Sequence, residues 1–233
     1  MKNSNFILFL SVYVLVQVLQ VSNAEPYDYM QFVLQYPPGL CYSLPKGQCI
    51  SPLPTKFTIH GIWPSNNSGI FVTCPKALAK HPFVAAQITT PLKVNLSKSW
   101  PSVLKSKTNL QFWQHEYEKH GACAVESGTP PLTQKSYFER GDQLWNLYDI
   151  YGVLNKSGIK PNATSPYNMT QLLTPIKTKI GSNPVIKCKK STNKYVLQEV
   201  IICMDHQAKK ILTCPSSIKT NCQDPSGKIY YVA

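Results

Sequence analysis

The chain has 233 residues and a formal net charge of +13, because 24 lysine and arginine residues outnumber 11 aspartate and glutamate residues. A chain of this length buries one good-sized core and needs no second domain, and past its first residues no segment is long and apolar enough to hold it in a membrane. The charge makes a polyanion the natural partner, whether nucleic acid, acidic cell-wall polysaccharide or an anionic membrane surface.

The first residues have the layout of a secretory signal peptide. Lys2 precedes an apolar run over residues 6–21, and residues 22–24 carry the small–spacer–small pattern of a cleavage site just before polar residues begin. An uncleaved membrane anchor is the alternative, but three polar residues interrupt the run, and about 20 apolar residues are needed to span a bilayer. We therefore predict cleavage after Ala24, which removes Lys2 and leaves residues 25–233 as a secreted, extracellular chain with a net charge of +12.

Seven segments of the mature chain have strand or helix patterns, and no repeat or linker divides them. In chain order, strands are predicted at residues 29–35 and 56–60, helices at 110–120, 136–151 and 170–180, and strands at 195–204 and 210–213. Helices in the middle and strands at both ends, joined through hairpins, predict the α+β class. We expect a single domain with a central antiparallel sheet and helices packed on it.

All eight cysteines lie in the mature chain, and an even number in a chain that enters the oxidising secretory route predicts disulfides. A structural zinc site is the alternative, but no Cys-x-x-Cys pair occurs and the spacings are wide. Spacing alone does not choose among the pairings. Only Cys203 and Cys214 can be paired locally, since a strand at 195–204, a turn at 205–207 and a return at 210–213 would place them across a hairpin.

Two further features concern the surface. Arg140 is the only arginine, so lysine supplies every other side-chain cation. Lysine is a mobile point charge without the planar fork that reads guanine edges, so the basic surface should attract phosphate generally and specify little. Asn-x-Ser/Thr sequons fit the secretory history, and those that carry sugar must lie at the surface. The five sequons begin at Asn66, Asn95, Asn155, Asn162 and Asn168.

The segment 57–64, Phe-Thr-Ile-His-Gly-Ile-Trp-Pro, places His60 after β-forming residues and directly before Gly61. A histidine at a strand end beside glycine can face a cleft, because the backbone can be approached closely there. A satisfied structural histidine beside a core Trp63 is the alternative.

Ionisable side chains gather in the segment 112–121, Phe-Trp-Gln-His-Glu-Tyr-Glu-Lys-His-Gly. On an α-helix with His115 at zero, Lys119 falls at about 40°, Glu116 at about 100° and His120 at about 140°, so one side presents two imidazoles, a carboxylate and an ammonium. A solvated polar face with ordinary helix-surface pairs is the alternative. A zinc-protease helix is excluded, because its second histidine comes four residues after the first, where Lys119 would repel the metal.

Together the two segments resemble the paired active-site motifs of the ribonuclease T-two family, Phe-Thr-x-His-Gly-x-Trp-Pro and, further along the chain, Phe-Trp-x-His-Glu-x-x-Lys-His-Gly-x-Cys. Both motifs are nearly complete here, at residues 57–64 and 112–123. The resemblance extends from residues 31–35, which look like the family's first strand, to the late cysteines. It therefore covers essentially the whole mature chain.

The resemblance implies a metal-independent endoribonuclease, with no cofactor, that cleaves single-stranded RNA by transphosphorylation to 2′,3′-cyclic phosphate ends. His120 would be the base that takes the 2′-OH proton, and His60 the acid that protonates the leaving oxygen. Lys119 would offset the phosphoryl charge, Glu116 would assist by holding a neighbouring donor or the phosphate, and His115 would bind phosphate. Histidine suits both proton transfers, because its ordinary pKa of about 6.5 allows one ring to be neutral and another charged.

The candidates for holding bases are Trp63, Phe112, Trp113 and Gln35, because stacking on an aromatic ring is worth ~1–3 kcal/mol per base. For each aromatic residue the core is the alternative place. The resemblance also implies four disulfides, which would join Cys41 to Cys49, Cys74 to Cys123, Cys188 to Cys222 and Cys203 to Cys214.

Within the family, the strong basicity and the several sequons resemble the plant S-locus ribonucleases, which the style secretes in self-incompatibility. The rival subgroup, the S-like ribonucleases of defence and phosphate starvation, is more often acidic. For the S-locus role we expect a monomer that binds single-stranded RNA and a pollen-side recognition protein, with no membrane partner. A catalytically silent secreted glycoprotein that coats RNA or another polyanion is a different class of function. The joint presence of both histidines, Glu116 and Lys119 argues against it.

Overall fold

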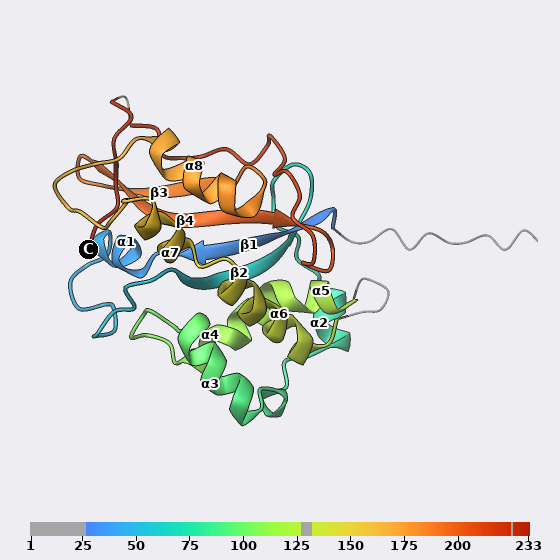
Figure 1. Ribbon diagram of the computed structural model, residues 1–233. Helices are drawn as coiled ribbons and strands as arrows, with labels where there is room; N and C mark the ends of the chain where they lie inside the picture. The colour runs from blue at the N-terminus through green and yellow to red at the C-terminus, as the bar shows by residue number, and fades with distance from the viewer. Residues whose placement is uncertain (1–26, 127–131, 225) are drawn as a thin grey trace, which may run out of the picture.

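The structure, a computed structural model, describes residues 27–126, 132–224 and 226–233. The predicted signal peptide lies outside these residues. The centre is a sheet in the order β2-β1-β4-β3 whose neighbours are antiparallel, and a short β5 pairs in parallel with β4 (Figure 1). The strands are β1 (Tyr29–Gln35), β2 (Thr58–Ser65), β3 (Val185–Ser191), β4 (Lys194–Met204) and β5 (Ile229–Tyr230). The predicted α+β fold with a central antiparallel sheet is confirmed.

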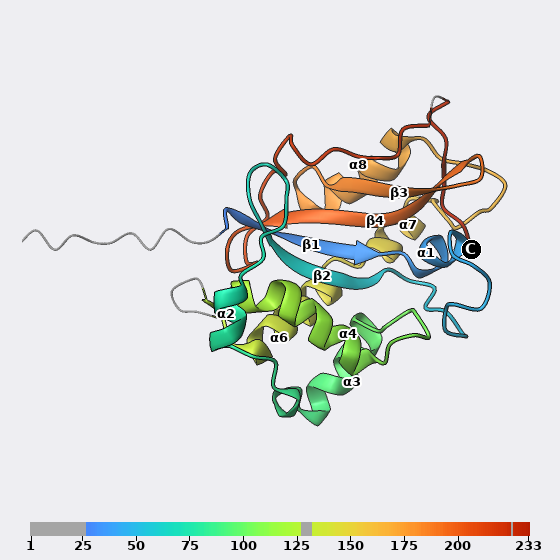
Figure 2. The ribbon, with the colours of Figure 1, turned by 180° about the vertical axis from the view of Figure 1, so that it is seen from behind.

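The helices lie in two main groups. In both views, α7 and α8 lie over one face of the sheet, whereas α2 to α6 lie along its β2 side (Figures 1 and 2). No helix within the described ranges is both long and apolar enough to cross a membrane. The helices are α1 (Pro37–Tyr42), α2 (Pro75–Lys80), η1 (Ala85–Gln87), α3 (Thr90–Ser99), α4 (Asn109–Glu116), η2 (Tyr117–Gly121), α5 (Ala122–Glu126), α6 (Gln134–Leu147), α7 (Ile150–Lys156) and α8 (Met169–Ile180).

The strand β1 lies between β2 and β4, and its alternating side chains reach an apolar cluster on each face of the sheet. Met30, Phe32 and Leu34 belong to the main core. Tyr29 and Val33 belong to a smaller cluster on the opposite face. The strand is buried along its whole length, and its observed bounds are the predicted ones.

Two predictions about elements are corrected, and the strand β3 has no counterpart among the predicted elements. The segment 210–213 is no strand and makes only an isolated bridge between Met204 and Ile211. The helix predicted at 136–151 is two helices, α6 and α7, and the side chain of Asp149 caps the second. β3 is absent from the predicted elements, because three lysines break its apolar alternation. As an edge strand it tolerates them.

Four disulfides join Cys41 to Cys49, Cys74 to Cys123, Cys188 to Cys222 and Cys203 to Cys214. These are the pairs that the resemblance implies. The Cys203–Cys214 bond closes a turn after β4 although the returning segment forms no strand. The Cys74–Cys123 bond joins the start of α2 to α5, at the last residue of the second motif.

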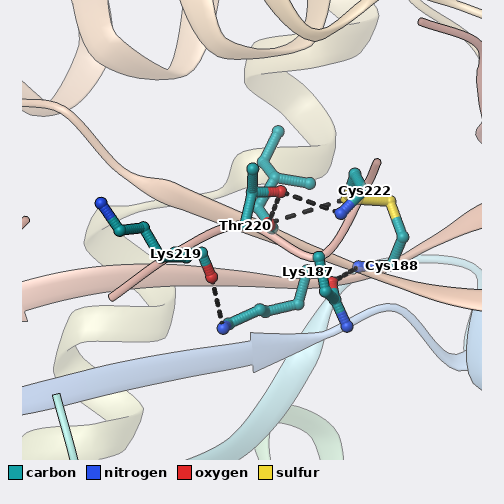
Figure 3. Close-up of a disulfide and its surroundings, with 7 residues drawn as sticks. Lys187, Cys188, Lys219, Thr220 and Cys222 are labelled. Carbon is teal, nitrogen blue, oxygen red and sulfur yellow. Dashed lines mark hydrogen bonds between the residues drawn. A yellow bond between two sulfur atoms is a disulfide. The ribbon is translucent and has the colours of Figure 1, made fainter. Parts of the chain in front are cut away.

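The Cys188–Cys222 disulfide fastens residues 219–222 along the outer edge of β3 (Figure 3). The Asn221 side-chain oxygen accepts a hydrogen bond of 2.7 Å from the Cys188 backbone N–H. The Thr220 hydroxyl donates one of 2.8 Å to a carbonyl of β3. Along this stretch, the last strand of the sheet is therefore covered by its own chain.

Candidate active site

His60 occupies a β-bulge in β2. In the β1–β2 ladder, Gly61 pairs with Val33 and Ile59 pairs with Leu34, so His60 has no partner on β1. A bulge of this kind bends the strand and re-aims the side chain of the extra residue. The side chain of His60 is accordingly 32% exposed, while the adjacent Ile59 is buried in the core.

His120 is positioned by a π-helical turn. The α-helix α4 ends at Glu116, and the chain continues as the π-helix η2, which contains Lys119 and His120. The α-helical angles predicted for this segment therefore hold only as far as Glu116. Such turns are rare and frequently lie at functional sites. Glu116 and His120 are each 2% exposed, whereas His115 and Lys119 lie at the surface.

The two motifs meet at the indole of Trp63. Its ring centroid lies 5.0 Å from that of His60, edge to face, and 5.2 Å from that of His120, roughly stacked. Phe71, which no motif predicted, contacts His120 from another side at a centroid distance of 5.1 Å. Two segments far apart in sequence therefore place both imidazoles against one aromatic ring.

A partly buried hydrogen bond also joins the two motifs. The Trp63 Nε1 donates to Oε2 of Glu116 at 3.0 Å. Burial raises the pKa of Glu116, and the opposing effects of His60, the Trp63 bond and the nearby lysines only partly cancel it. The protonated form of this carboxyl is thus favoured relative to an exposed glutamate.

His120 is held in its neutral form. Burial, Lys119, His60 and His115 all lower its pKa, to about 3. Its Nδ1 is buried without a hydrogen-bond partner among the described residues. Because Nδ1 is enclosed in the protein, a proton from a substrate would have to be accepted at Nε2. A neutral imidazole is a group that can accept a proton.

Glu199, a residue outside both motifs, favours the protonated form of His60. The His60 Nδ1 lies 2.7 Å from Oε1 of Glu199, which belongs to β4. Burial lowers the pKa of His60, but the hydrogen bond and charge of Glu199, with the charge of Glu116, outweigh burial and raise it above 6.5. An imidazolium is a group that can donate a proton.

Two exposed side chains of the second motif, Lys119 and His115, lie near these rings. Lys119 Nζ lies 5.0 Å from the centroid of the Phe71 ring. Partial burial, Lys107 and Lys119 lower the pKa of His115. Within the described residues, no group of three or more His, Cys, Asp or Glu side chains is arranged to hold a metal ion.

Two cavities open on either side of Glu199, which lines both of them. The first has a volume of about 210 Å³ and is lined by His60, Gln35, Phe112 and His115, among others. The second has a volume of about 290 Å³ and is lined by Trp63, Phe71, Lys187 and Asn221, among others. Three of the four predicted base-holding residues, Gln35, Trp63 and Phe112, therefore line a cavity beside the histidines.

Trp113 is the exception among them. Its side chain is 0% exposed, and its Nε1 donates a hydrogen bond of 2.7 Å to the Trp100 carbonyl. Its ring packs in the core, on the inner side of α4, and lines neither cavity. The expectation that Trp113 holds a base is therefore corrected, and the alternative reading of it as a core residue holds.

Comparison with known proteins agrees with this geometry. The sequence profile of the Ribonuclease T2 family matches residues 27–214. The extracellular ribonuclease LE of Solanum lycopersicum is 33% identical over 221 residues, which are 92% of each chain. Ribonuclease S-7 of Nicotiana alata is 33% identical over 193 residues, which cover 81% of this chain and 82% of that protein.

Solved structures match along most of the chain as well. Ribonuclease MC1 from the seeds of bitter gourd superposes with a TM-score of 0.74 at 31% identity, covering 85% of this chain and 98% of that chain. The SF11 ribonuclease of Nicotiana alata, associated with gametophytic self-incompatibility, has a TM-score of 0.74 at 27% identity and covers 89% of this chain and 100% of that chain. By sequence profile, by relatives and by fold, the chain belongs to the Ribonuclease T2 family.

Proposed function

We propose that this ribonuclease cleaves single-stranded RNA by transphosphorylation, with neutral His120 as the base and protonated His60 as the acid. The observation that carries the proposal is the pair of imidazoles on one Trp63 indole, whose pKa values are moved in opposite directions. Two titratable groups with pKa values pushed apart are what acid–base catalysis at a single pH needs.

In the first step, His120 accepts the proton of the ribose 2′-OH while that oxygen bonds to phosphorus. The bond from phosphorus to the 5′-oxygen breaks, and His60 gives that oxygen its proton. The products are a 2′,3′-cyclic phosphate and a free 5′-OH. Water then opens the cyclic phosphate to a 3′-phosphate with the two histidines in exchanged roles, which returns both rings to their starting protonation states.

The neighbouring side chains stabilise the charge that gathers on the phosphoryl oxygens. Lys119 lies next to His120 in η2 and offsets this charge. Glu116 acts by holding the Trp63 indole between the rings. His115, at the surface and in the wall of the first cavity, binds a phosphate oxygen. The proton transfers themselves are made by imidazoles and require no metal.

The two cavities are our candidate sites for the bases on either side of the cleaved bond. Phe112 and Gln35 offer an aromatic face and an amide in the first, and Trp63 and Phe71 offer aromatic faces in the second. Stacking tolerates every base, because each has a π face. A mutant of ribonuclease MC1 that is 32% identical to this chain has been solved in complex with 5′-GMP, which supports a nucleotide site on this fold.

The proposal includes secretion and glycosylation. We propose that residues 1–24 are removed as a signal peptide and that residues 25–233 form the extracellular catalytic domain. Among the sequon asparagines, Asn95, Asn155 and Asn168 are exposed, and Asn66 and Asn162 are half-buried. Glycan release followed by mass measurement, with sequencing of the mature N-terminus, tests both points.

We further propose that the chain is the style-side ribonuclease of self-incompatibility, a monomer recognised by a pollen-side protein. The net charge of +13 and the likeness to ribonuclease S-7 support this role. The S-like role is the rival proposal, and identity does not decide between the two, since the extracellular ribonuclease LE is as similar to this chain as ribonuclease S-7 is. Expression confined to the style is the expected result, and expression mainly in leaves under phosphate starvation would contradict it.

The activity is tested on the purified protein with single-stranded RNA and with DNA of the same sequence, both in the presence of a chelator. We expect RNA fragments with 2′,3′-cyclic phosphate ends and intact DNA, because DNA lacks the 2′-OH nucleophile. Intact RNA in a stable complex would instead identify a polyanion-binding glycoprotein. Loss of cleavage in the chelator would contradict the metal-free mechanism.

A further inference from the structure

The hydrogen bond between His60 and Glu199 is built by two irregularities in the sheet. His60 is the extra residue of the bulge in β2. In the β3–β4 ladder, Lys187 pairs with Glu199 and Cys188 pairs with Leu197, so Gln198 is the extra residue of a second bulge. Glu199 therefore lies at a bend in β4, as His60 lies at a bend in β2.

The bond crosses the central strand. In β1, Gln35 pairs with Thr58 of β2 on one side and with Glu199 of β4 on the other. Adjacent strands lie about 4.8 Å apart, so His60 and Glu199 reach towards each other over β1. The side chain of Gln35, on β1 between the two strands, is buried, and its Nε2 donates to the Ile59 carbonyl at 3.5 Å. The side chains of His60 and Glu199 are 32% and 16% exposed.

We propose that Glu199 is a positioning residue for the acid of the reaction. It accepts the hydrogen bond from Nδ1–H of His60, fixes the orientation of the ring and leaves Nε2 as the nitrogen that exchanges protons with the substrate. The proposal rests on the proposed function, because it assumes that His60 is the acid. Glu199 touches neither the phosphate nor the leaving oxygen in this role.

The proton balance of the ring follows from this arrangement. In the first step, Nε2 gives its proton to the 5′-oxygen, and the ring stays neutral with its Nδ1–H still bonded to Glu199. The bare Nε2 is then the atom that accepts a proton from water when the cyclic phosphate is opened. Glu199 keeps its charge throughout and takes up no proton, as an orienting carboxylate beside a catalytic histidine does.

The charged groups that face His60 come from three elements. Glu199 of β4 and Glu116 of α4 favour its protonated form, whereas Lys119 of η2 opposes it. Of the two carboxylates, only Glu199 makes a hydrogen bond to the ring, at 2.7 Å among the described residues. Removal of its charge should therefore remove the larger part of the stabilisation of the imidazolium.

A purely structural ion pair that joins β2 to β4 is the alternative. The chain itself offers a matched control, because His81 and Glu126 form a second histidine–glutamate contact of 2.7 Å on the helical side, outside both cavities. A general effect of losing such a pair would appear in Glu126→Gln as well. An effect on catalysis would appear only in Glu199→Gln.

The test compares two substrates. One is a dinucleotide, whose 5′-oxygen must be protonated to leave, and the other is a nucleoside 3′-(4-nitrophenyl phosphate), whose leaving group departs without a proton. For the dinucleotide, we expect Glu199→Gln to move the alkaline limb of the kcat/KM profile to lower pH. Above that limb, activity should fall about tenfold for each unit by which the pKa of His60 drops. Cleavage of the nitrophenyl ester should change little.

Two further measurements keep the result decisive. An NMR titration of the His60 ring should show a lower pKa in Glu199→Gln, and Glu199→Asp, which keeps the charge on a shorter side chain, should restore part of it. Equal losses on both substrates, or an unmoved pKa of His60 in a folded Glu199→Gln, would overturn the inference. If His60→Asn cleaves the dinucleotide like the unsubstituted protein, the proposed function itself fails, and the two failures are thus distinguishable.

Discussion

The indole of Trp63 and the carboxyl of Glu116 are joined by a partly buried hydrogen bond of 3.0 Å, and Gly61 lies directly against it. A Cβ added at Gly61 would come closer than atoms can approach both to the indole nitrogen and to the carboxylate oxygen. The glycine of the first motif is therefore required by the space between two side chains, since its backbone is not in the left-handed region.

We predict that Gly61→Ala separates Trp63 from Glu116 and moves the indole against which both histidines rest. A misplacement of about 1 Å can cost about 10²-fold in rate, so kcat/KM for RNA should fall by roughly this factor. Trp63→Phe keeps an aromatic ring and removes only the N–H donor, and it should lose less activity. A larger loss in Trp63→Phe than in Gly61→Ala would contradict this explanation.

His60→Asn and His120→Asn should each abolish one proton transfer and lower the rate of RNA cleavage by about 10²–10⁴-fold. Single-turnover cleavage measures the loss, and circular dichroism checks that the fold is kept. His81→Asn, which removes an imidazole outside both cavities, is the control and should cleave normally. Near-normal turnover in either active-site variant would refute its assigned role.

The pH dependence of kcat/KM should be a broad bell. The base must be neutral, so activity falls as pH drops through the pKa of His120, which is lowered to about 3. The acid must be protonated, so activity falls as pH rises through the pKa of His60, which is raised above 6.5. The residual activity of His60→Asn should lack the alkaline limb. An alkaline limb below 6.5 in the unsubstituted protein would contradict the environment described for His60.

Disulfide removal should destabilise the protein according to the size of the loop that each bond closes. Loss of the Cys74–Cys123 bond, with a sequence separation of 49, should cost about 4 kcal/mol in the free energy of unfolding by the chain-entropy model. Loss of the Cys41–Cys49 bond, with a separation of 8, should cost about 2.5 kcal/mol. Denaturant unfolding of the two double-alanine variants measures both, and the reverse order would contradict the prediction.

Much of the fold follows from local pattern. The side chains of residues 29–35 have a strand-like pattern, and the prolines from Pro37 onward mark the end of that strand. The observed strand has the predicted bounds. The strand β3 is harder to predict from sequence, because Lys187, Lys189 and Lys190 interrupt the apolar pattern of a strand. The edge position of β3 in the sheet permits these lysines. The residue types of both motifs point to proton transfer and phosphate binding without any knowledge of the fold.

The remaining features of the site depend on tertiary structure. The π-helical turn sets where Lys119 and His120 lie relative to α4, and no α-helical projection gives this. Trp113 lies in the regular part of α4, and only the packing of that helix against the core decides that its ring is buried. Glu199 meets His60 only through the register of β1, β2 and β4 and through two bulges. No local pattern around Glu199 distinguishes it from any other polar residue of a strand.

The covered edge of β3 has a consequence for how copies of the protein meet. An open sheet edge is a template to which a strand of another molecule can add. Here Asn221 already occupies the Cys188 N–H, and the disulfide to Cys222 holds that segment in place. Reduction of this one bond would release the segment and expose the strand, so self-association into extended sheets should begin from the reduced protein while the oxidised protein stays dispersed at high concentration.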